Sequence, residues 1–162
     1  MDELHASLAL LFAELIDGPS PDAAYMLNGG DPGLLRSLDR LSAAAASSAS
    51  ASGGATIAAH VDHVRYGLGL MNRWSDGDPD PWSSADWTAS WRRTTVTEEE
   101  WAALREQLRG ETRRWHKALQ TPRKMSALEL NGVIASVGHL AYHLGAIRQI
   151  DKALRGPKEG TF

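Results

Sequence analysis

Apolar residues near the start of the chain recur every three or four positions, the spacing of one face of an α-helix. They form a broad apolar face over residues 2–16, made of Leu4, Leu8, Leu10, Leu11, Phe12, Leu15 and Ile16. The sequence Asp17-Gly18-Pro19 follows and ends the pattern. The pattern therefore predicts an amphipathic helix over residues 2–16.

Two further helices are predicted before residue 75. The first begins at Asp31-Pro32, an N-cap residue and a first-turn proline, and continues through Leu34, Leu35, Leu38 and Leu41. Residues 42–54 are alanine, serine and glycine, so we expect a flexible connection into which the alanines extend this helix by a turn or two. The second runs from Thr56 to Trp74 with an apolar stripe of Ile57, Val61, Val64, Leu68 and Met71.

Residues 75–96 are rich in proline, glycine and aspartate, which predicts a loop with a short helical turn near residues 86–91. The loop contains Trp82, Trp87 and Trp91. Tryptophans in such a segment either anchor it to the helices or line the mouth of a substrate site, and we favour the anchor. Three alternating aspartates resemble part of a calcium loop, but its closing glutamate is missing, so calcium is rejected.

The last two predicted helices each open with a capping box. One begins at Thr97 with Glu100 at its third position and runs to about Gln120. The other begins at Ser126 and runs for about thirty residues until the stop at Gly156-Pro157. Because no stretch alternates like a strand, the fold class is all-α: one domain, residues 1–162, folded as an up-and-down four-helix bundle with an additional short helix in a crossover loop.

Composition narrows the classes of partner. A chain of 162 residues with 43% hydrophobic and 23% charged residues is long enough to bury a core as one domain. Its formal charge of −3 offers no basic surface for nucleic acid. The first residues are acidic and no apolar run reaches the roughly 20 residues that cross a bilayer. We therefore expect no nucleic acid or membrane partner, and a cytoplasmic location.

Candidate chemistry lies in the last predicted helix. His139 and His143 are four residues apart, so both imidazoles can face one point and hold a metal ion. The alternative is a hydrogen-bonded pair without a ligand. Their stripe consists otherwise mainly of small residues and lies beside an aliphatic stripe, Val133, Val137, Leu140, Leu144 and Ile147. The small residues would leave open volume over the imidazoles, which favours a site.

A third ligand is expected from the helix over residues 56–74, since facing helices commonly build metal sites from inward-pointing side chains. His60 lies on the flank of its apolar stripe, and His63 follows one turn later and shares that flank. Either histidine, or both, could complete the site. We interpret His5 as structural or exposed and His116 as a surface residue.

The order of these parts resembles the DinB/YfiT-like family of four-helix-bundle metalloproteins. The resemblance rests on Thr-Ile-Ala-Ala-His60-Val-Asp-His63 followed by His139-Leu-Ala-Tyr-His143-Leu-Gly-Ala-Ile-Arg, and it covers almost the whole chain. It implies a divalent transition metal (zinc, nickel or iron) bound by His60, His139 and His143, with His63 as the rival for the first place. Members often carry a glutamine three residues after the last histidine, where this chain has Ala146.

The resemblance implies a metal-dependent enzyme that acts on a small-molecule substrate with a low-molecular-weight thiol, as a transferase or isomerase. The chain contains no cysteine, so the thiol would be a cosubstrate, and disulfides and zinc–thiolate sites are excluded. The alternatives are a hydrolase that uses metal-bound water and a non-catalytic, stress-associated binding protein. A homodimer is also implied. Asp62 and Arg148 lie near the ligands in sequence; they could support the ligands or bind an anion, but we favour solvated or inter-helix ion-pair roles.

Overall fold

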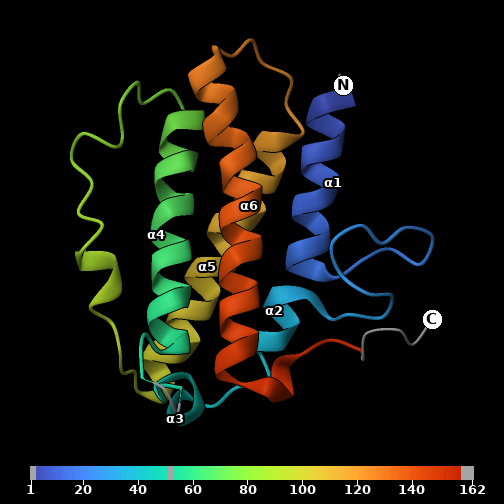
Figure 1. Cartoon of the computed structure of the whole chain (residues 1–162). Helices are drawn as coiled ribbons and strands as arrows, with labels where there is room; N and C mark the ends of the chain where they lie inside the picture. The colour runs from blue at the N-terminus through green and yellow to red at the C-terminus, as the bar shows by residue number, and fades with distance from the viewer. Residues whose placement is uncertain (1–2, 51–52, 158–162) are drawn as a thin grey trace.

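A computed structural model of the chain describes residues 3–50 and 53–157, and it is helical without a β-strand over these residues (Figure 1). Four helices are long: α1 (Glu3–Asp17), α4 (Ile57–Ser75), α5 (Glu98–Leu119) and α6 (Ala127–Ile150). The short ones are α2 (Gly33–Leu38), α3 (Ala43–Ala46) and the 3-10 turns η1 (Ala89–Trp91) and η2 (Lys152–Leu154). The predicted all-α class is confirmed.

The long helices pack so that α1 and α4 each contact both α5 and α6. Figure 1 shows that α4 and α5 run in the same direction, because residues 76–97 return along the outside of α4 before α5 begins. Two hydrogen bonds agree with this arrangement: Thr56 bonds to Thr94 just before the two helices start, and Asn72 bonds to Glu111 toward their ends. The strict alternation of directions is therefore interrupted at this crossover segment, residues 76–97.

The core follows the predicted apolar stripes. On α6 the five aliphatic residues of the predicted stripe are all buried, and on α4 the stripe is buried from Ile57 to Leu68. Met71 is only half-buried, and Leu70 is buried instead. The indoles of Trp101 and Trp115 are also buried, and each of their N–H groups donates a hydrogen bond. Each fully buried aliphatic side chain of the core contributes about 1.5–3 kcal/mol.

The starts of α4, α5 and α6 agree with the sequence, but α2 begins later than predicted: its N-cap is Pro32 instead of Asp31, and Pro32 makes no side-chain capping hydrogen bond. Thr56 accepts a hydrogen bond from the amide of Ala59 and begins α4. Both predicted capping boxes are present, Thr97 with Glu100 on α5 and Ser126 with Glu129 on α6. These caps satisfy first-turn amides that have no partner within the helix, and they fix where the histidine-bearing helices begin.

Two predicted helices are shorter in the structure. The helix expected from Asp31 through the alanines ends at Leu38, because the Ser42 side chain caps the amide of Ala45 and starts a separate helix, α3. The last helix ends at Ile150, because Asp151 is extended (φ −121°, ψ 106°) and its side chain caps η2.

Within the part of the chain that is described, no helix has the length and apolarity needed to cross a bilayer.

Candidate metal centre

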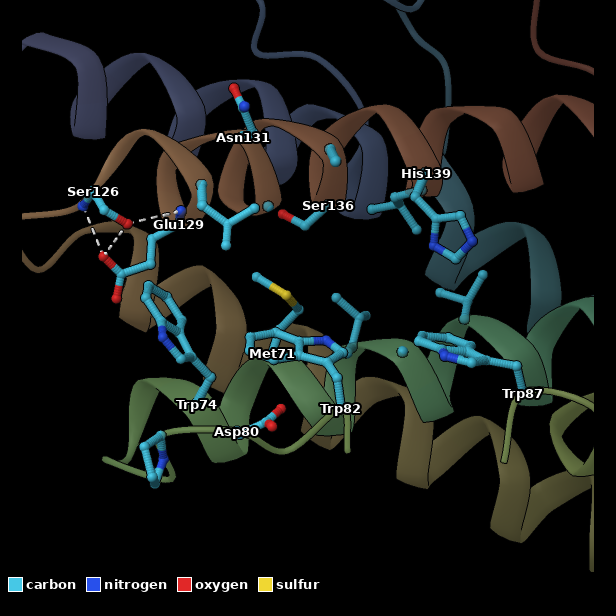
Figure 2. Close-up of a pocket in the computed structure, with 18 residues that line it drawn as sticks. Met71, Trp74, Asp80, Trp82, Trp87, Ser126, Glu129, Asn131, Ser136 and His139 are labelled. Atoms are coloured by element: carbon cyan, nitrogen blue, oxygen red, sulfur yellow. Dashed lines mark hydrogen bonds between the residues drawn. The ribbon is translucent and has the colours of Figure 1, made fainter. Parts of the chain in front are cut away.

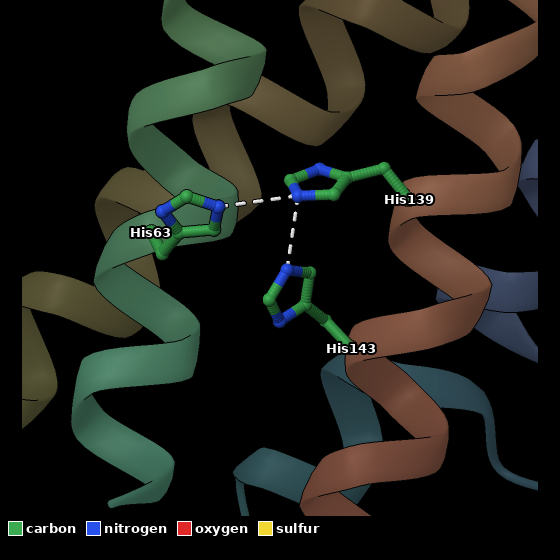
Figure 3. Close-up of side chains that lie close together, drawn as sticks. All are labelled: His63, His139 and His143. Carbon is green, nitrogen blue, oxygen red and sulfur yellow. Dashed lines mark hydrogen bonds between the residues drawn. The ribbon is translucent and has the colours of Figure 1, made fainter. Parts of the chain in front are cut away.

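Three imidazoles from two helices converge in the interior (Figure 3). His63 comes from α4, and His139 and His143 come from α6. Nε2 of His139 lies 3.2 Å from Nε2 of His63 and 2.9 Å from Nε2 of His143. All three candidate ligand atoms lie within 4.8 Å of one another. His63 and His143 are buried, and His139 is half-buried.

These separations match the edges of a coordination polyhedron. Two nitrogens bound to one zinc ion at about 2.0–2.1 Å lie about 3.3 Å apart in a tetrahedral site and about 2.9 Å apart at a right angle. The two Nε2–Nε2 distances around His139, 3.2 and 2.9 Å, fall in this range. Two of the three edges of the cluster therefore have the length expected in a metal site, and the third pair of ligand atoms lies within 4.8 Å.

Ser90 fixes the proton of His63. Its Oγ lies 2.8 Å from Nδ1 of His63 and donates its only proton to the carbonyl of Trp87, at 2.7 Å. Ser90 must then accept from Nδ1–H of His63. Since neutral imidazole has one N–H, the lone pair of His63 lies on Nε2 and faces the other two rings. A hydrogen bond on the outer nitrogen is the usual support for a metal-binding histidine.

His60 lies behind His143. Its Nδ1 is 2.8 Å from Nδ1 of His143, on the side of that ring away from the three converging Nε2 atoms. When His143 donates this hydrogen bond, its Nε2 also presents a lone pair to the cluster. The sequence preferred His60 as the third ligand and kept His63 as the rival. The structure places all four histidines together, with His63 among the three whose Nε2 atoms converge.

Hydrogen bonding alone satisfies this cluster poorly. Nε2 of His139 faces the lone pairs of both His63 and His143, but one imidazole nitrogen carries at most one proton. A cation among three lone pairs would satisfy all of them. Three neutral imidazoles are suitable ligands for zinc, nickel or iron. The donor set therefore fits a divalent transition metal.

The protonation states favour a metal as well. Burial, followed by repulsion from neighbouring imidazoles, lowers the pKa of His63 to about 4 and that of His143 to about 3. Burial also lowers the pKa of His60 and of His139. All four rings are thus neutral near pH 7, and their lone pairs are available without the loss of a proton.

The crossover segment covers the cluster with aromatic rings. Trp91 stacks on His63 with ring centroids 4.2 Å apart, and its edge meets His60 at 5.2 Å. This contact agrees with the predicted anchoring role. Trp82 and Trp87 remain 39% and 42% exposed and line a cavity, which is the alternative that the sequence analysis favoured less.

The remaining charged and histidine candidates lie outside the cluster. Asp62 pairs with Arg65 at 2.7 Å and with Arg93 at 3.1 Å. Arg148 pairs with Asp31 at 2.7 Å. Both expected ion pairs are confirmed. His5 is buried and His116 half-buried, and neither belongs to the cluster.

A cavity of about 1070 Å³ extends from His139 between α4 and α6 (Figure 2). The crossover segment forms its third wall through Pro79, Asp80, Trp82 and Trp87. On α6 the lining includes Gly132, Ser136 and His139, so open volume lies beside part of the predicted stripe of small residues and over His139, whereas the described lining does not include His143. No lysine or arginine occurs among the described residues that line it. The candidate metal centre thus borders a large, mainly apolar site.

Ser90 and the α4 side of the cavity were not identified from the sequence. A serine within a short helical turn has no pattern that relates it to a histidine 27 positions earlier.

Comparison of the chain with protein families, with curated proteins and with solved structures found no match. The function therefore has to be inferred from the chemistry of the site itself.

Proposed function

We propose that this chain is a metal-dependent enzyme in which His63, His139 and His143 hold one divalent transition metal beside a small-molecule site. The observation that carries the proposal is the convergence of three Nε2 atoms, 2.9 and 3.2 Å apart around His139, at one end of the cavity. In this proposal His63 replaces His60 as the third ligand. His60 instead accepts the hydrogen bond that orients His143.

An ion with three protein ligands keeps open positions, and it supplies Lewis acidity that polarises a substrate or lowers the pKa of a bound nucleophile. The chain's residues prepare this site. Ser90 holds His63 in the correct tautomer, and Trp91 covers the ring of His63. His139, half-buried, connects the centre with the cavity, so a substrate in the cavity can reach it.

The nucleophile we propose is a low-molecular-weight thiol, as in a thiol transferase or isomerase. The chain has no cysteine, so the thiol would enter as a cosubstrate. A hydrolase, the alternative, needs a general base near the reacting water. Asp62, the acidic residue nearest in sequence, is held by Arg65 and Arg93. Because no cation lines the described cavity, any carboxylate of the thiol would lie outside it.

We also propose that the four long helices form a four-helix bundle of the DinB/YfiT-like type. Its support is the packing of α1 and α4 on α5 and α6, and the order of the histidines along α4 and α6. The crossover segment, which makes α4 and α5 parallel, is the feature that a solved structure has to reproduce.

The test of the metal centre is elemental analysis of protein purified without a metal-affinity tag. We expect about one transition metal per chain, lost in His63→Ala and in His143→Ala. His60→Ala should keep the stoichiometry but bind about 10–100-fold more weakly, because it removes only a supporting hydrogen bond. His116→Ala, outside the cluster, is the control. Loss of metal in His60→Ala but not in His63→Ala would contradict the assignment.

The reaction class needs its own assay. Metal-loaded protein is mixed with a small thiol and an aryl halide, and separately with a nitrophenyl ester without thiol. We expect metal-dependent formation of the thioether in the first mixture, lost in His63→Ala. Metal-dependent ester hydrolysis without thiol would instead identify the hydrolase. Inactivity in both assays would favour the non-catalytic binding protein.

A further inference from the structure

The cavity is long rather than round (Figure 2). One wall is α4, which contributes Val64, Leu68 and Met71 at helical spacing. The opposite wall is α6, on which His139 and Glu129 lie about 15 Å apart at 1.5 Å per residue. His139 stands at one end and Glu129 at the other. The shape suits an elongated molecule that lies along both helices.

The walls are apolar from the histidine end outward. Indoles of the crossover segment face Val64, Leu68 and Leu140 across the cavity. The carboxylates toward the outer end are already occupied: Glu129 accepts from Ser126, and Asp80 accepts from the amide of Ser83. Leu128, at the outer rim, is 81% exposed. The body of a ligand would therefore meet mainly apolar side chains, with Asn131 and the two carboxylates among the polar groups of the lining.

Two glycines keep this passage open. A Cβ on Gly67 would meet Trp87 at 3.7 Å and His139 at 3.8 Å, so any larger side chain would enter the space beside the metal end. Gly132 has no atom within 4 Å of the place where its Cβ would lie, and it lines the middle of the cavity. A side chain added at Gly132 would occupy the space that a ligand would use.

We infer that the substrate is an amphiphile, with one metal-binding head group beside His139 and an apolar tail of up to about twelve carbons along α4 and α6, since an extended chain advances about 1.2 Å per bond. This inference rests on the proposed metal centre and names the class of substrate for it. The proposed metal ion would bind the head group, and the apolar side chains of the cavity walls would contact the tail.

The test is the binding of n-alkyl hydroxamates of increasing chain length to the zinc-loaded protein, measured by calorimetry. Affinity should rise about fourfold with each methylene, because each buried CH₂ contributes about 0.8 kcal/mol. The rise should stop near twelve carbons, where the tail reaches solvent. Alkyl alcohols of the same lengths, which lack the metal-binding head, should bind at least tenfold more weakly.

Gly132→Phe places a ring across the middle of the cavity, about 10 Å along α6 from His139. The rise in affinity should then stop at about eight carbons, while zinc binding is unchanged. Gly145→Phe is the matched control, since Gly145 is exposed on the same helix and does not line the cavity. Ala135→Phe is a second blocking variant in case Gly132→Phe does not fold.

The outcomes separate the two proposals. If zinc binds but affinity is independent of chain length, or if both blocking variants behave like Gly145→Phe, the amphiphile is wrong and the metal centre stands. If the wild type binds no zinc, both are wrong. A plateau that moves from about twelve to about eight carbons in Gly132→Phe, or to about five carbons in Ala135→Phe, supports the amphiphile.

Discussion

The buried side chain of Ser90 fixes the tautomer of His63, one of the proposed ligands. Because its hydroxyl proton is used on the carbonyl of Trp87, the serine can only accept from His63, and this fixes which nitrogen of His63 faces the cluster. In the proposed site His143 donates to His60 across the 2.8 Å between their Nδ1 atoms, which would turn the lone pair of its Nε2 toward the cluster. Two of the three proposed ligands thus have a partner that orients them.

Ser90→Ala should weaken zinc binding about tenfold, because the Nδ1–H of His63 loses its acceptor and the ring can rotate or change tautomer. The measurement is competition with a chromophoric chelator. Ser84→Ala, an exposed serine in the same crossover segment, is the control. Equal zinc affinity in Ser90→Ala and Ser84→Ala would show that the serine does not support the site.

The pairing of His139 with His143 was predictable, since residues four apart share a helix face in any packing. The choice between His60 and His63 was not. Residues three apart differ by about 60° around the helix, so both lie on the same flank of α4. Which of them points at α6 depends on the rotation of α4 about its axis, and that is set by tertiary packing.

At the scale of elements, the crossover segment is the least predictable part of the fold and the most important for the site. Its composition indicated a loop with a short helical turn, and η1 confirms the turn. Without periodicity, the sequence could not show that the segment runs along α4. It contributes Ser90 and Trp91 to the candidate metal centre and two further indoles to the cavity.

The long helices, by contrast, were predicted well because apolar periodicity and capping residues agree along each of them. The two errors, in the extent of the second and last helices, have local causes. Ser42 and Asp151 use their side chains to cap a new turn, which interrupts the helix that the pattern would continue.

Asp62→Asn should loosen the crossover segment, because the buried carboxylate of Asp62 holds Arg93 as well as Arg65. We expect a loss of about 1–2 kcal/mol in the free energy of unfolding, together with faster tryptic cleavage after Arg92 and Arg93. Asp39→Asn breaks a comparable pair of arginine contacts outside this segment and is the control. Cleavage at the same rate in both variants would contradict this role of Asp62.

For the molecule as a whole, the cluster of three buried imidazoles and one half-buried imidazole is a source of acid sensitivity. The folded pKa values of His63 and His143, about 4 and about 3, lie below the unfolded value of 6.5. The unfolded chain therefore binds more protons below pH 6.5, and stability that is present above this pH is lost as the pH falls toward 4 and 3. A bound metal would stabilise the folded state, and acid would oppose its binding because protons compete for the same nitrogens.

The metal-free protein should accordingly lose up to about 1.4 kcal/mol per pH unit for each of these two histidines below pH 6.5. Urea unfolding at pH 7 and pH 5 measures this difference. The double variant His63→Gln with His143→Gln should show a much flatter dependence. A wild-type free energy of unfolding that is the same at both pH values would contradict the proposed neutral cluster.

The most direct measurement is anomalous diffraction from crystals of the zinc-loaded protein, collected on both sides of the zinc absorption edge. We predict one peak at about 2.0–2.1 Å from Nε2 of His63, His139 and His143, with His60 bonded to the outer nitrogen of His143. A peak bound by His60 in place of His63 would contradict the ligand assignment. No peak at the cluster would contradict the metal centre itself.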